Sequence, residues 1–381
     1  MQGRRLTIVQ LLPALNAGGV ERSTLEIGHA LVAAGHRSVM ISAGGRLLDQ
    51  LAAQGSEHIA LDIGRKSAAT LRHIWTLRRL FSEIRPDIVH ARSRLPAWLA
   101  HLALRGMPAP KHSALKLPAL KPHFVTSVHG LNSPGAYSAI LTRGVRVICV
   151  SNTVRDYVLR HYPRTDPARL SVIPRGVDPV EFPFGYLPDD AWRRGFFADF
   201  PQLAGGPLLT LPGRGTRLKG HHDAIELLAG LAARGLDCRL LLLGAREPGR
   251  EAYVAELEAL ARRRGVAQRV AISVPRNDVR EILAISTLVL QLSTRPEAFG
   301  RTVIEALALC RPVLGYGHGG VGELLAELYP EGRVPPGDAT RLVERAAELL
   351  RVAPPIAPLT RFRLADMQAA TLDLYAELAG G

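Results

Sequence analysis

Two glutamates in the C-terminal half of the chain are spaced so that they could take part in catalysis or ligand binding. In the stretch TRPEAFGRTVIEAL (294–307), Glu297 precedes the Phe299-Gly300 pair and Glu305 follows it within a predicted helix. Paired carboxylates could share acid–base work, or each could accept hydrogen bonds from a different part of one ligand. The N–H groups of the first helical turn have no intrahelical acceptor, so they could donate to a sugar hydroxyl or a phosphate.

A cationic loop lies upstream in the same half. In LPGRGTRLKGHHDAIELL (211–228) a predicted strand ends at Gly213, and Arg214 and Lys219 follow before a helix expected to begin near Asp223. Two cations that lead to a helix N-terminus can clamp a diphosphate, because their charges and the helix dipole both favour an anion there. A solvent-exposed basic loop is the alternative interpretation.

Two glycine-rich turns and a histidine follow other predicted strands. Gly18 and Gly19, in NAGGVERS, form either a turn that lets a ligand approach backbone N–H groups or only a close helix–strand turn. The GxGxxG fingerprint of dinucleotide-binding dehydrogenases is absent. His129 ends the predicted strand HFVTSVHG, where its imidazole could polarise or hydrogen-bond a substrate hydroxyl. The turn GYGHGGVGELL (315–325) could close over the ligand of the glutamate pair.

Short apolar runs alternate with helical patterns along the whole chain, which indicates parallel sheets covered by helices on both faces. A Pro- and Gly-rich segment at 170–206 separates two such series and suits a domain junction. We therefore predict two doubly wound, Rossmann-like α/β domains at 1–182 and 183–360, with a C-terminal helix at about 361–381 packing back on the first. The predicted strands are 6–12, 38–44, 58–63, 86–92, 123–130 and 145–151 in the first domain, and 207–215, 238–245, 269–274, 287–293 and 311–317 in the second.

The chain of 381 residues carries a net charge of +14, and the excess lies in its first half. Residues 1–190 hold 24 basic and 13 acidic residues, against 24 and 21 in the remainder. Basic surfaces attract nucleic acid, anionic lipid or acidic substrates, whereas a genome that favours Arg codons is the alternative explanation. Because aromatic residues make up only 5% of the chain, it lacks the stacking platforms of a nucleic-acid binder, and we expect no nucleic-acid partner.

The cysteines and the hydropathy pattern predict a cytoplasmic protein. Cys149, Cys238 and Cys310 are scattered without a CxxC pair, which argues for a reducing compartment and against a zinc site or a disulfide scaffold. No run of about 18 apolar residues is present, so we expect no membrane-spanning helix.

Two basic segments of the first half allow alternative interpretations. Residues 65–85 combine apolar residues at helical spacing with Arg and Lys, so this helix could lie on an anionic membrane surface or pack on the core with a solvated face. The Pro- and Lys-rich stretch 107–123 is too long for a routine strand–helix connection and is either a mobile substrate loop or a flexible excursion.

With these residues assembled, the chain resembles the GT-B glycosyltransferases, specifically the retaining group called family 4 or group 1. The C-terminal motifs are most similar in wording to enzymes of bacterial lipopolysaccharide core assembly. The matching motifs occur in order along nearly the whole chain: GGVER (18–22), VHG (128–130), VSNTVRDYV (150–158), VIPRGVD (172–178), GRGTRLKG (213–220) and the E-x7-E element (297–305).

The resemblance implies that the C-terminal domain holds a nucleotide sugar, that the N-terminal domain holds the acceptor, and that the cleft between them holds the reaction. Arg214 and Lys219 would bind the diphosphate and stabilise it as the leaving group. Glu305 would hold the ribose hydroxyls, and Glu297 would contact the donor sugar. The implied donor-binding residues are Gly213, Arg214, Lys219, Phe299, Gly300, Arg301 and Glu305.

The resemblance also assigns residues around the reaction centre. His129 would lie near the C6 of the sugar or the reacting atoms, while Gly18 and Gly19 would face the acceptor or a phosphate. The implied catalytic residues are His129, Arg214, Lys219 and Glu297. The family's retention of configuration is discussed as front-face attack, with the acceptor hydroxyl deprotonated by the departing phosphate, so Glu297 need not be a nucleophile.

The implied chemistry requires no metal and no cofactor, because Arg and Lys can offset the charge that develops on the diphosphate. The adjacent pair Asp189-Asp190 lies in the linker and does not form a DxD metal site. We expect transfer of a hexose or hexosamine, with uridine favoured as the base only by family frequency. The expected acceptor is an anionic saccharide or glycolipid, such as a lipopolysaccharide core, with room for a peripheral contact of the basic domain with the inner membrane.

Alternatives remain on the same fold. A nucleotide-sugar epimerase would need further carboxylates and histidines near the donor. A phosphorylase would need a lysine-bound pyridoxal phosphate. A non-catalytic sugar-nucleotide-binding partner would not need the intact set of charged residues. Two positions depart from the family pattern. Arg175 stands where many relatives have Asn, which could alter an acceptor or hinge contact, and Cys310 stands where Gly is common, which we attribute to packing.

Overall fold

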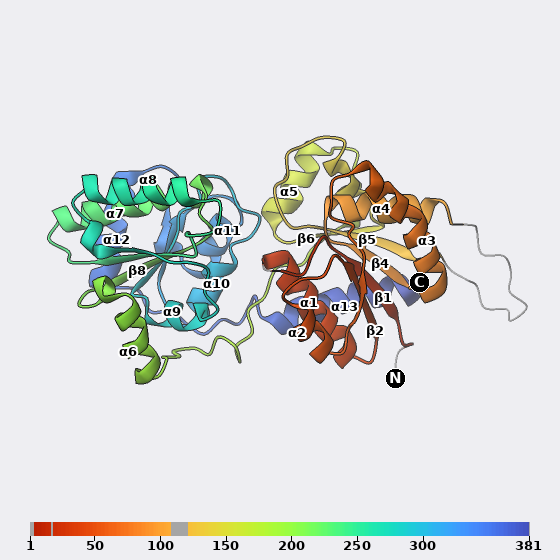
Figure 1. Ribbon diagram of the computed structural model, residues 1–381, viewed down its shortest axis with the longest axis horizontal. Helices are drawn as coiled ribbons and strands as arrows, with labels where there is room; N and C mark the ends of the chain where they lie inside the picture. Colours follow the sequence, from red (N-terminus) through yellow and green to blue (C-terminus); the bar gives the residue numbers. More distant parts are fainter. Residues whose placement is uncertain (1–3, 17, 108–120, 381) are drawn as a thin grey trace, which may run out of the picture. The chain divides into compact units, whose positions relative to one another are not determined.

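The computed structural model describes residues 4–16, 18–107 and 121–380 (Figure 1). The chain divides into two compact units, an N-terminal unit of Met1–Arg175 with Leu364–Gly381 and a C-terminal unit of Gly176–Arg363. The boundary falls ahead of the predicted residue 182, because Val177 forms a parallel bridge with Arg363 and thereby belongs to the second unit. Most of the 107–123 stretch lies outside the described residues.

The N-terminal unit is built on one parallel sheet with strand order β3-β2-β1-β4-β5-β6-β7 over its described residues. The first six strands match predicted runs. The last is three residues long and lies in the segment that the Pro and Gly content marked as a junction, which is why the pattern did not reveal it. The strands are β1 (Thr7–Leu11), β2 (Arg37–Ser42), β3 (Glu57–Ala60), β4 (Ile88–Ala91), β5 (His123–Val128), β6 (Arg146–Cys149) and β7 (Leu170–Val172).

Helices cover both faces of this sheet (Figure 1). The helix α13 returns from the end of the chain to lie beside α1, and Ile27, Ile8 and Tyr375 meet there in one buried cluster. The burial of Tyr375, which is 1% exposed, anchors the C-terminal helix to this unit. The helices are α1 (Gly19–Ala33), α2 (Leu48–Ala53), α3 (His73–Ile84), α4 (Arg94–Arg105), α5 (Asn152–His161) and α13 (Leu364–Gly380).

The basic segment 65–85 combines features of both of its predicted alternatives. It begins as a 3-10 turn (Ala68–Arg72) capped by Ser67 and continues as α3. Leu77 and Phe81 are buried, and the helix packs on α4, so one apolar stripe belongs to the core. Leu71 and Trp75, however, remain 51% and 65% exposed.

The C-terminal unit repeats the architecture with strand order β10-β9-β8-β11-β12-β13 across the strands that the structure describes. The sheet is parallel throughout, and β13 has only two residues, too few for a periodic pattern to reveal. The strands are β8 (Leu208–Pro212), β9 (Arg239–Leu243), β10 (Val270–Ile272), β11 (Leu288–Gln291), β12 (Val313–Tyr316) and β13 (Arg333–Val334).

Two helix starts in this unit bear on the site. The helix predicted near Asp223 begins at His221, and the one predicted at Phe299-Gly300 begins at Arg301, with Gly300 as its N-cap. The helices are α6 (Asp190–Asp199), α7 (His221–Ala233), α8 (Glu251–Arg263), α9 (Val279–Ile285), α10 (Arg301–Ala308), α11 (Gly319–Leu328) and α12 (Ala339–Arg351).

The structure gives a physical reason for the unusual Cys310. This residue follows the end of α10 with a φ of +59°, and its N–H donates to the Leu307 carbonyl over 3.0 Å. A left-handed residue after a helix is a position that glycine occupies at lowest cost. Glycine would therefore adopt the backbone conformation of this position at lower cost than cysteine does.

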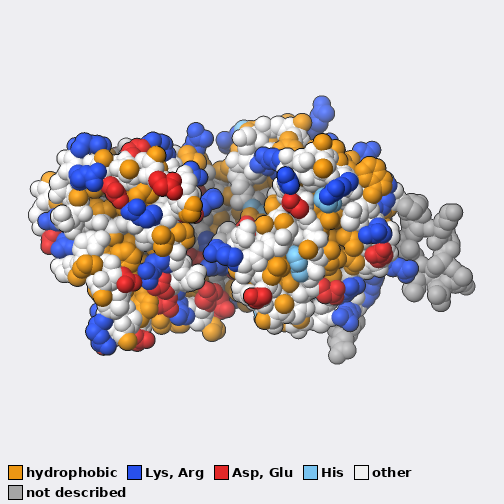
Figure 2. All heavy atoms as spheres, viewed as in Figure 1, with side chains coloured by type: hydrophobic (Ala, Val, Ile, Leu, Met, Phe, Trp, Pro, Cys, Tyr) orange, Lys and Arg blue, Asp and Glu red, His pale blue; other side chains and the backbone are white. Residues whose placement is uncertain are grey.

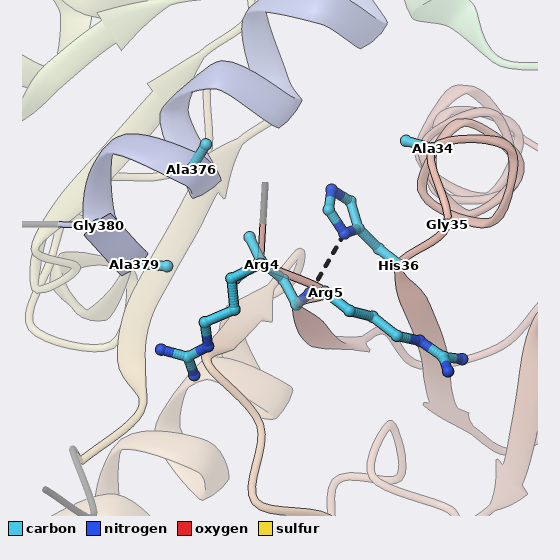
Figure 3. Close-up of a pocket in the computed structure, with 9 residues that line it drawn as sticks. Arg4, Arg5, Ala34, Gly35, His36, Ala376, Ala379 and Gly380 are labelled. Atoms are coloured by element: carbon cyan, nitrogen blue, oxygen red, sulfur yellow. Dashed lines mark hydrogen bonds between the residues drawn. The ribbon is translucent and has the colours of Figure 1, made fainter. Parts of the chain in front are cut away.

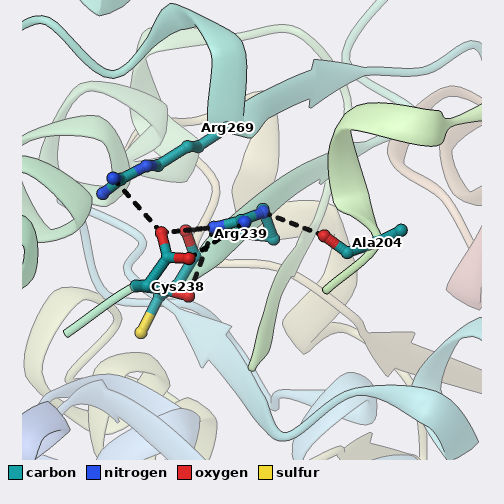
Figure 4. A network of polar contacts seen from close by, with 5 residues as sticks. Ala204, Cys238, Arg239 and Arg269 are labelled. Carbon is teal, nitrogen blue, oxygen red and sulfur yellow. Dashed lines mark hydrogen bonds and ion pairs between the residues drawn. The ribbon is translucent and has the colours of Figure 1, made fainter. Parts of the chain in front are cut away.

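On the face shown in Figure 2, Lys and Arg side chains are interspersed with acidic and hydrophobic ones. One network lies at the start of β9, where Arg239 donates to the Ala204 carbonyl over 3.1 Å and to the Asp237 carboxylate over 2.7 Å, and Arg269 reaches the same carboxylate (Figure 4). Exposed pairs of this kind contribute little each, so we assign this network to local order. No helix among the described residues is long and apolar enough to cross a membrane.

Candidate functional site

The candidate residues of the C-terminal unit gather at the carboxyl edge of its sheet. The strand β8 leads on to β9 on one side and has β11 as its other neighbour, so the connections diverge at the β8–β11 boundary. In open α/β sheets, ligands bind outside the carboxyl ends of strands at such a switch point. Gly213 follows β8, and Ser293 follows β11 by one residue, so the two loops that the sequence singled out start side by side.

The loop after β8 brings Lys219 back to the strand end. A short 3-10 turn (Arg217–Lys219) precedes Gly220, which has a φ of +75° and is the N-cap of α7. A Cβ at Gly220 would lie 2.0 Å from the Leu292 carbonyl oxygen, so only glycine lets this loop approach the end of β11. The stem of Lys219 lies over Gly213, where a Cβ would be 3.1 Å from the lysine Cγ. The side chain of Arg214 is exposed in the same loop.

Lys219 and Glu297 form a direct ion pair. The lysine Nζ lies 2.6 Å from Glu297 Oε1, and the two side chains are 28% and 25% exposed. Ser293 donates its hydroxyl to the same carboxylate oxygen, and the Gln291 Nε2 donates to Oε2 over 3.4 Å. The sequence placed Lys219 and Glu297 in one site with separate roles, and the fold brings them into contact. Ser293 and Gln291 were missed, although both occupy the end of a strand that had been recognised.

The helix α10 presents an open N-terminus to the same edge. Gly300, with a φ of +133°, is its N-cap and supplies no side-chain cap, so the first amide groups can donate to a ligand. Phe299 is only 7% exposed, and the centroid of its ring lies 6.2 Å from that of Phe362, so the ring is part of the packing of this unit. Glu305, 7% exposed, accepts a hydrogen bond of 3.0 Å from Arg301 one turn earlier. This pairing explains how a carboxylate can be buried inside the helix.

The glycine-rich turn before α11 supports the loop that carries Glu297. The Gly320 N–H donates to the Glu297 carbonyl over 2.7 Å, and His318 Nε2 lies 2.7 Å from the Ser293 carbonyl, to which it donates. A Cβ at Gly320 would lie 2.4 Å from Phe299 Cα, and one at Gly319 would lie 2.6 Å from the Glu297 carbonyl oxygen. The glycines are therefore required for close packing against residues 297–299, which places this turn behind the loop as its support.

The remaining candidates lie in the N-terminal unit, again at a carboxyl edge. Gly18, with a φ of +146°, is the N-cap of α1 after β1, and His129 follows β5. Gly18 therefore lies in the predicted connection between strand and helix, and Gly19 is the first residue of α1. The switch point of this sheet is the β1–β4 boundary, and a pocket of about 300 Å³ lies at this edge, lined by residues that include Arg92, Arg94 and His129.

Arg175 fixes the protonation state of His129. The Arg175 guanidinium, 9% exposed, donates to His129 Nδ1. Because arginine can only donate, Nδ1 is the acceptor and the ring proton of neutral His129 resides on Nε2. Burial, followed by the charges of Arg175 and Arg92, holds the pKa of His129 well below its usual value. His129 is thus a neutral hydrogen-bond donor through Nε2, a role that the sequence left open, and Nε2 has no protein partner among the described residues.

A larger pocket at the opposite edge of the same sheet is not a candidate. It measures about 730 Å³ and is lined by residues of the Arg4–Leu6 segment, the Ala34–His36 turn and the end of α13 (Figure 3). The Leu6 N–H donates to His36 Nδ1 over 3.2 Å, and burial, with the charge of Arg5, lowers the pKa of His36. This edge holds the amino ends of the strands, whereas α/β sheets bind ligands at the carboxyl ends.

Two family profiles match the chain. The one described as Glycosyltransferase Family 4 matches residues 17–181, and the one described as Glycosyl transferases group 1 matches residues 197–355. The chain is 31% identical to the alpha-maltose-1-phosphate synthase of Mycolicibacterium smegmatis over 185 residues, which are 48% of this chain and 46% of that protein. It spans about half the length of the curated relatives it matches.

Solved structures match over nearly the whole chain. A glycosyltransferase from Rickettsia africae superimposes with a TM-score of 0.83 at 25% identity, covering 98% of both chains. Anabaena Alr3699/HepE in complex with UDP-glucose superimposes with a TM-score of 0.77 at 18% identity, covering 98% of this chain and 100% of that one. Together with the two parallel sheets, these matches confirm the predicted GT-B fold class.

Proposed function

Since the chain belongs to the family 4, or group 1, glycosyltransferases, we propose that it is a retaining enzyme that moves a hexose or hexosamine from a UDP-sugar to an anionic glycan or glycolipid. The acceptor that the C-terminal sequence motifs of the chain favour is a lipopolysaccharide core. The observation that carries the proposal is the contact between Lys219 and Glu297 at the β8–β11 switch point. It joins a cation suited to a diphosphate with a carboxylate suited to a sugar hydroxyl.

The chemistry of the edge suits the parts of one nucleotide sugar. The Lys219 ammonium and the exposed Arg214 offer positive charge to the diphosphate, as does the open N-terminus of α10. Glu305 would bind the ribose of the donor, because a carboxylate can accept hydrogen bonds from two vicinal hydroxyls. Glu297, which contacts Lys219, would bind the sugar attached to that diphosphate.

In the proposed reaction the bond between the anomeric carbon and the diphosphate oxygen breaks, and the acceptor oxygen bonds to the same carbon from the same face. The departing phosphate takes the proton of the acceptor hydroxyl, so no protein nucleophile is needed. Lys219 and Arg214 offset the charge that develops on the leaving group, and such preorganised cations stabilise the transition state more than the ground state. We propose on this basis that the reaction requires no metal ion and no cofactor.

The acceptor proposal rests on charge. The N-terminal half of the sequence holds most of the net positive charge, and phosphates or acidic sugars on an acceptor would complement it. The relative from Mycolicibacterium smegmatis is named alpha-maltose-1-phosphate synthase, and this name includes a sugar phosphate.

Thermal unfolding in the presence of nucleotide sugars tests the proposal. We expect a UDP-sugar to raise the Tm, since a ligand at a hundredfold excess over its Kd adds about 2.7 kcal/mol of stability. GDP- and ADP-sugars provide the comparison for the base, and EDTA should leave the shift unchanged. If none of the three raises the Tm, the transferase proposal fails, and a shift that EDTA removes would contradict the metal-free clamp.

A peripheral membrane contact through α3 is a further part of the proposal. The exposed Trp75 and Leu71 lie on a segment that also exposes Arg72 and Arg79, a combination suited to the headgroup region of an anionic bilayer. We expect the protein to sediment with vesicles that contain anionic phospholipid but not with neutral vesicles, and Trp75→Ser to lower the bound fraction several-fold. The control is Leu187→Ser, which removes an equally exposed (61%) apolar side chain from the C-terminal unit. Equal sedimentation of wild type and Trp75→Ser would speak against the contact.

A further inference from the structure

The pocket at the carboxyl edge of the N-terminal sheet is lined by several charged and polar residues. It encloses about 300 Å³ at the β1–β4 switch point. A volume of this size suits a small ligand such as a monosaccharide derivative. The polar side chains that line it are those of Glu21, Arg92, Ser93, Arg94, Ser127, His129 and Asn132.

Arg92, directly after β4, is buried with an unused donor. Its side chain is 4% exposed; Nε donates to Gln10 Oε1 over 2.8 Å, and Nη1 to Ser23 Oγ over 3.5 Å. Nη2 meets no hydrogen-bond partner among the described residues. Burial lowers the pKa of Arg92, with Tyr375 and Glu26 opposing that effect. A buried guanidinium is costly without a counter-charge, and Arg92 lines this pocket, so an anion there would offset its charge.

Arg94 supplies the second cation from the first position of α4. Its Nη1 donates to Ser138 Oγ over 3.2 Å and its guanidinium lies 5.2 Å from the Tyr137 ring, which leaves further N–H groups available. Ser93, the N-cap of the twelve-residue helix α4, makes no side-chain capping bond and lines the pocket together with Arg94, so the N-terminus of α4 lies at the pocket. Two guanidinium groups and a helix N-terminus therefore favour negative charge in one place.

Of the other lining groups, His129 can donate to an anion, whereas the carboxylate of Glu21 opposes one. His129 is neutral and contributes its Nε2–H, which adds a donor without a charge. Glu21 is the acidic residue of the lining, and its carboxylate lies against Gly18 at the start of α1. The adjoining cavity between His90, Arg92 and Arg175 holds only about 10 Å³, too little for more than one water molecule.

We propose that this pocket binds the phosphate or carboxylate group of a sugar acceptor, with Arg92 and Arg94 as its specificity-determining residues. That the bound sugar is an acceptor rests on the proposed transferase function, whereas the anion binding rests on the pocket alone. Planar guanidinium groups bind both phosphate and carboxylate oxygens in pairs, so the two anions share one recognition chemistry.

Titration calorimetry with glucose 6-phosphate, glucuronate and glucose tests the pocket on the full chain. We expect both anionic sugars, but not glucose, to bind, and the stronger of the two identifies the preferred anion. Arg94→Gln should weaken binding of the anionic sugar about tenfold or more, as should Arg92→Lys, which keeps the charge but not the planar fork. Arg105→Gln is the matched control, because it removes the same charge from the exposed far end of α4.

Lys219→Ala separates this pocket from the donor site, where a phosphate could also bind. Binding of glucose 6-phosphate that survives Lys219→Ala but falls in Arg94→Gln supports the pocket. Binding that falls only in Lys219→Ala, or is equal in wild type, Arg94→Gln and Arg92→Lys, overturns it, as does the absence of anionic-sugar binding at millimolar concentration. Because the nucleotide-sugar Tm shift is measured separately, a protein that binds UDP-sugars but no anionic sugar refutes the pocket alone, and the converse refutes the transferase proposal alone.

Discussion

Replacing Lys219 with Ala should lower kcat about 10²–10³-fold, the usual cost of removing one preorganised group that meets charge developing in a transition state. The loss should appear mainly in kcat rather than in the KM for the donor, because charge on the leaving group grows as the bond breaks. The protein should remain folded, since the ion pair with Glu297 is partly exposed and such pairs contribute about 0–1 kcal/mol. The measurement is the rate at which nucleoside diphosphate is released from the nucleotide sugar that raises the Tm of the wild type.

A second basic residue in the same loop is the control for Lys219. Arg217 points away to Glu256 and is 68% exposed, so Arg217→Ala removes a charge from the 3-10 turn without touching the candidate site. We expect its kcat to stay within a few-fold of wild type. Turnover by Lys219→Ala equal to that of Arg217→Ala would remove Lys219 from the leaving-group role.

Replacing Gly320 with Ala should disable the donor site through the backbone. The added methyl group would lie 2.4 Å from Phe299 Cα and 2.5 Å from its carbonyl oxygen, and neither backbone atom can rotate aside as a side chain could. Overpacking of this kind costs about 1–3 kcal/mol of stability. Because the displaced residues 297–299 carry Glu297 and lead into α10, we expect kcat/KM to fall about a hundredfold, as positioning errors near 1 Å do.

The same substitution elsewhere in the unit isolates that effect. Gly195 lies in α6, with nothing within 4 Å of its would-be Cβ. Gly195→Ala should raise stability by about 0.5–1 kcal/mol, because alanine is the better helix former, and should leave kcat/KM unchanged. Thermal unfolding and steady-state kinetics on both variants decide the matter. A Gly320→Ala protein with wild-type Tm and kcat/KM would show that the turn does not support the loop.

The alternation of apolar runs and helical patterns was enough to predict two parallel α/β units, because strand and helix periods are local properties of the chain. It failed at β7 and β13, which have three and two residues and therefore show no period. The two compact units divide at 175/176 rather than at the predicted 182/183, and the bridge from Val177 to Arg363, which bears on this difference, joins residues far apart in sequence.

The sequence determined which residue types form the candidate site and that they lie at the carboxyl edge of the sheet. Carboxyl ends of parallel strands meet at one edge, so a strand followed by Gly213 and a strand followed by Glu297 had to bring their loops together. Arg92 was visible in the run PDIVHAR as a charged residue at the end of a buried strand, a signal that went unused.

Only the tertiary structure decided which side chains pair. Lys219 reaches Glu297 across 78 residues of sequence, and Arg175 reaches His129 across 46. The first contact depends on loop conformation and on close glycine packing at Gly220 and Gly320, which no local pattern encodes. The contacts set the chemistry: the first joins a cation to a carboxylate, and the second leaves His129 as a neutral donor because arginine cannot accept a hydrogen bond.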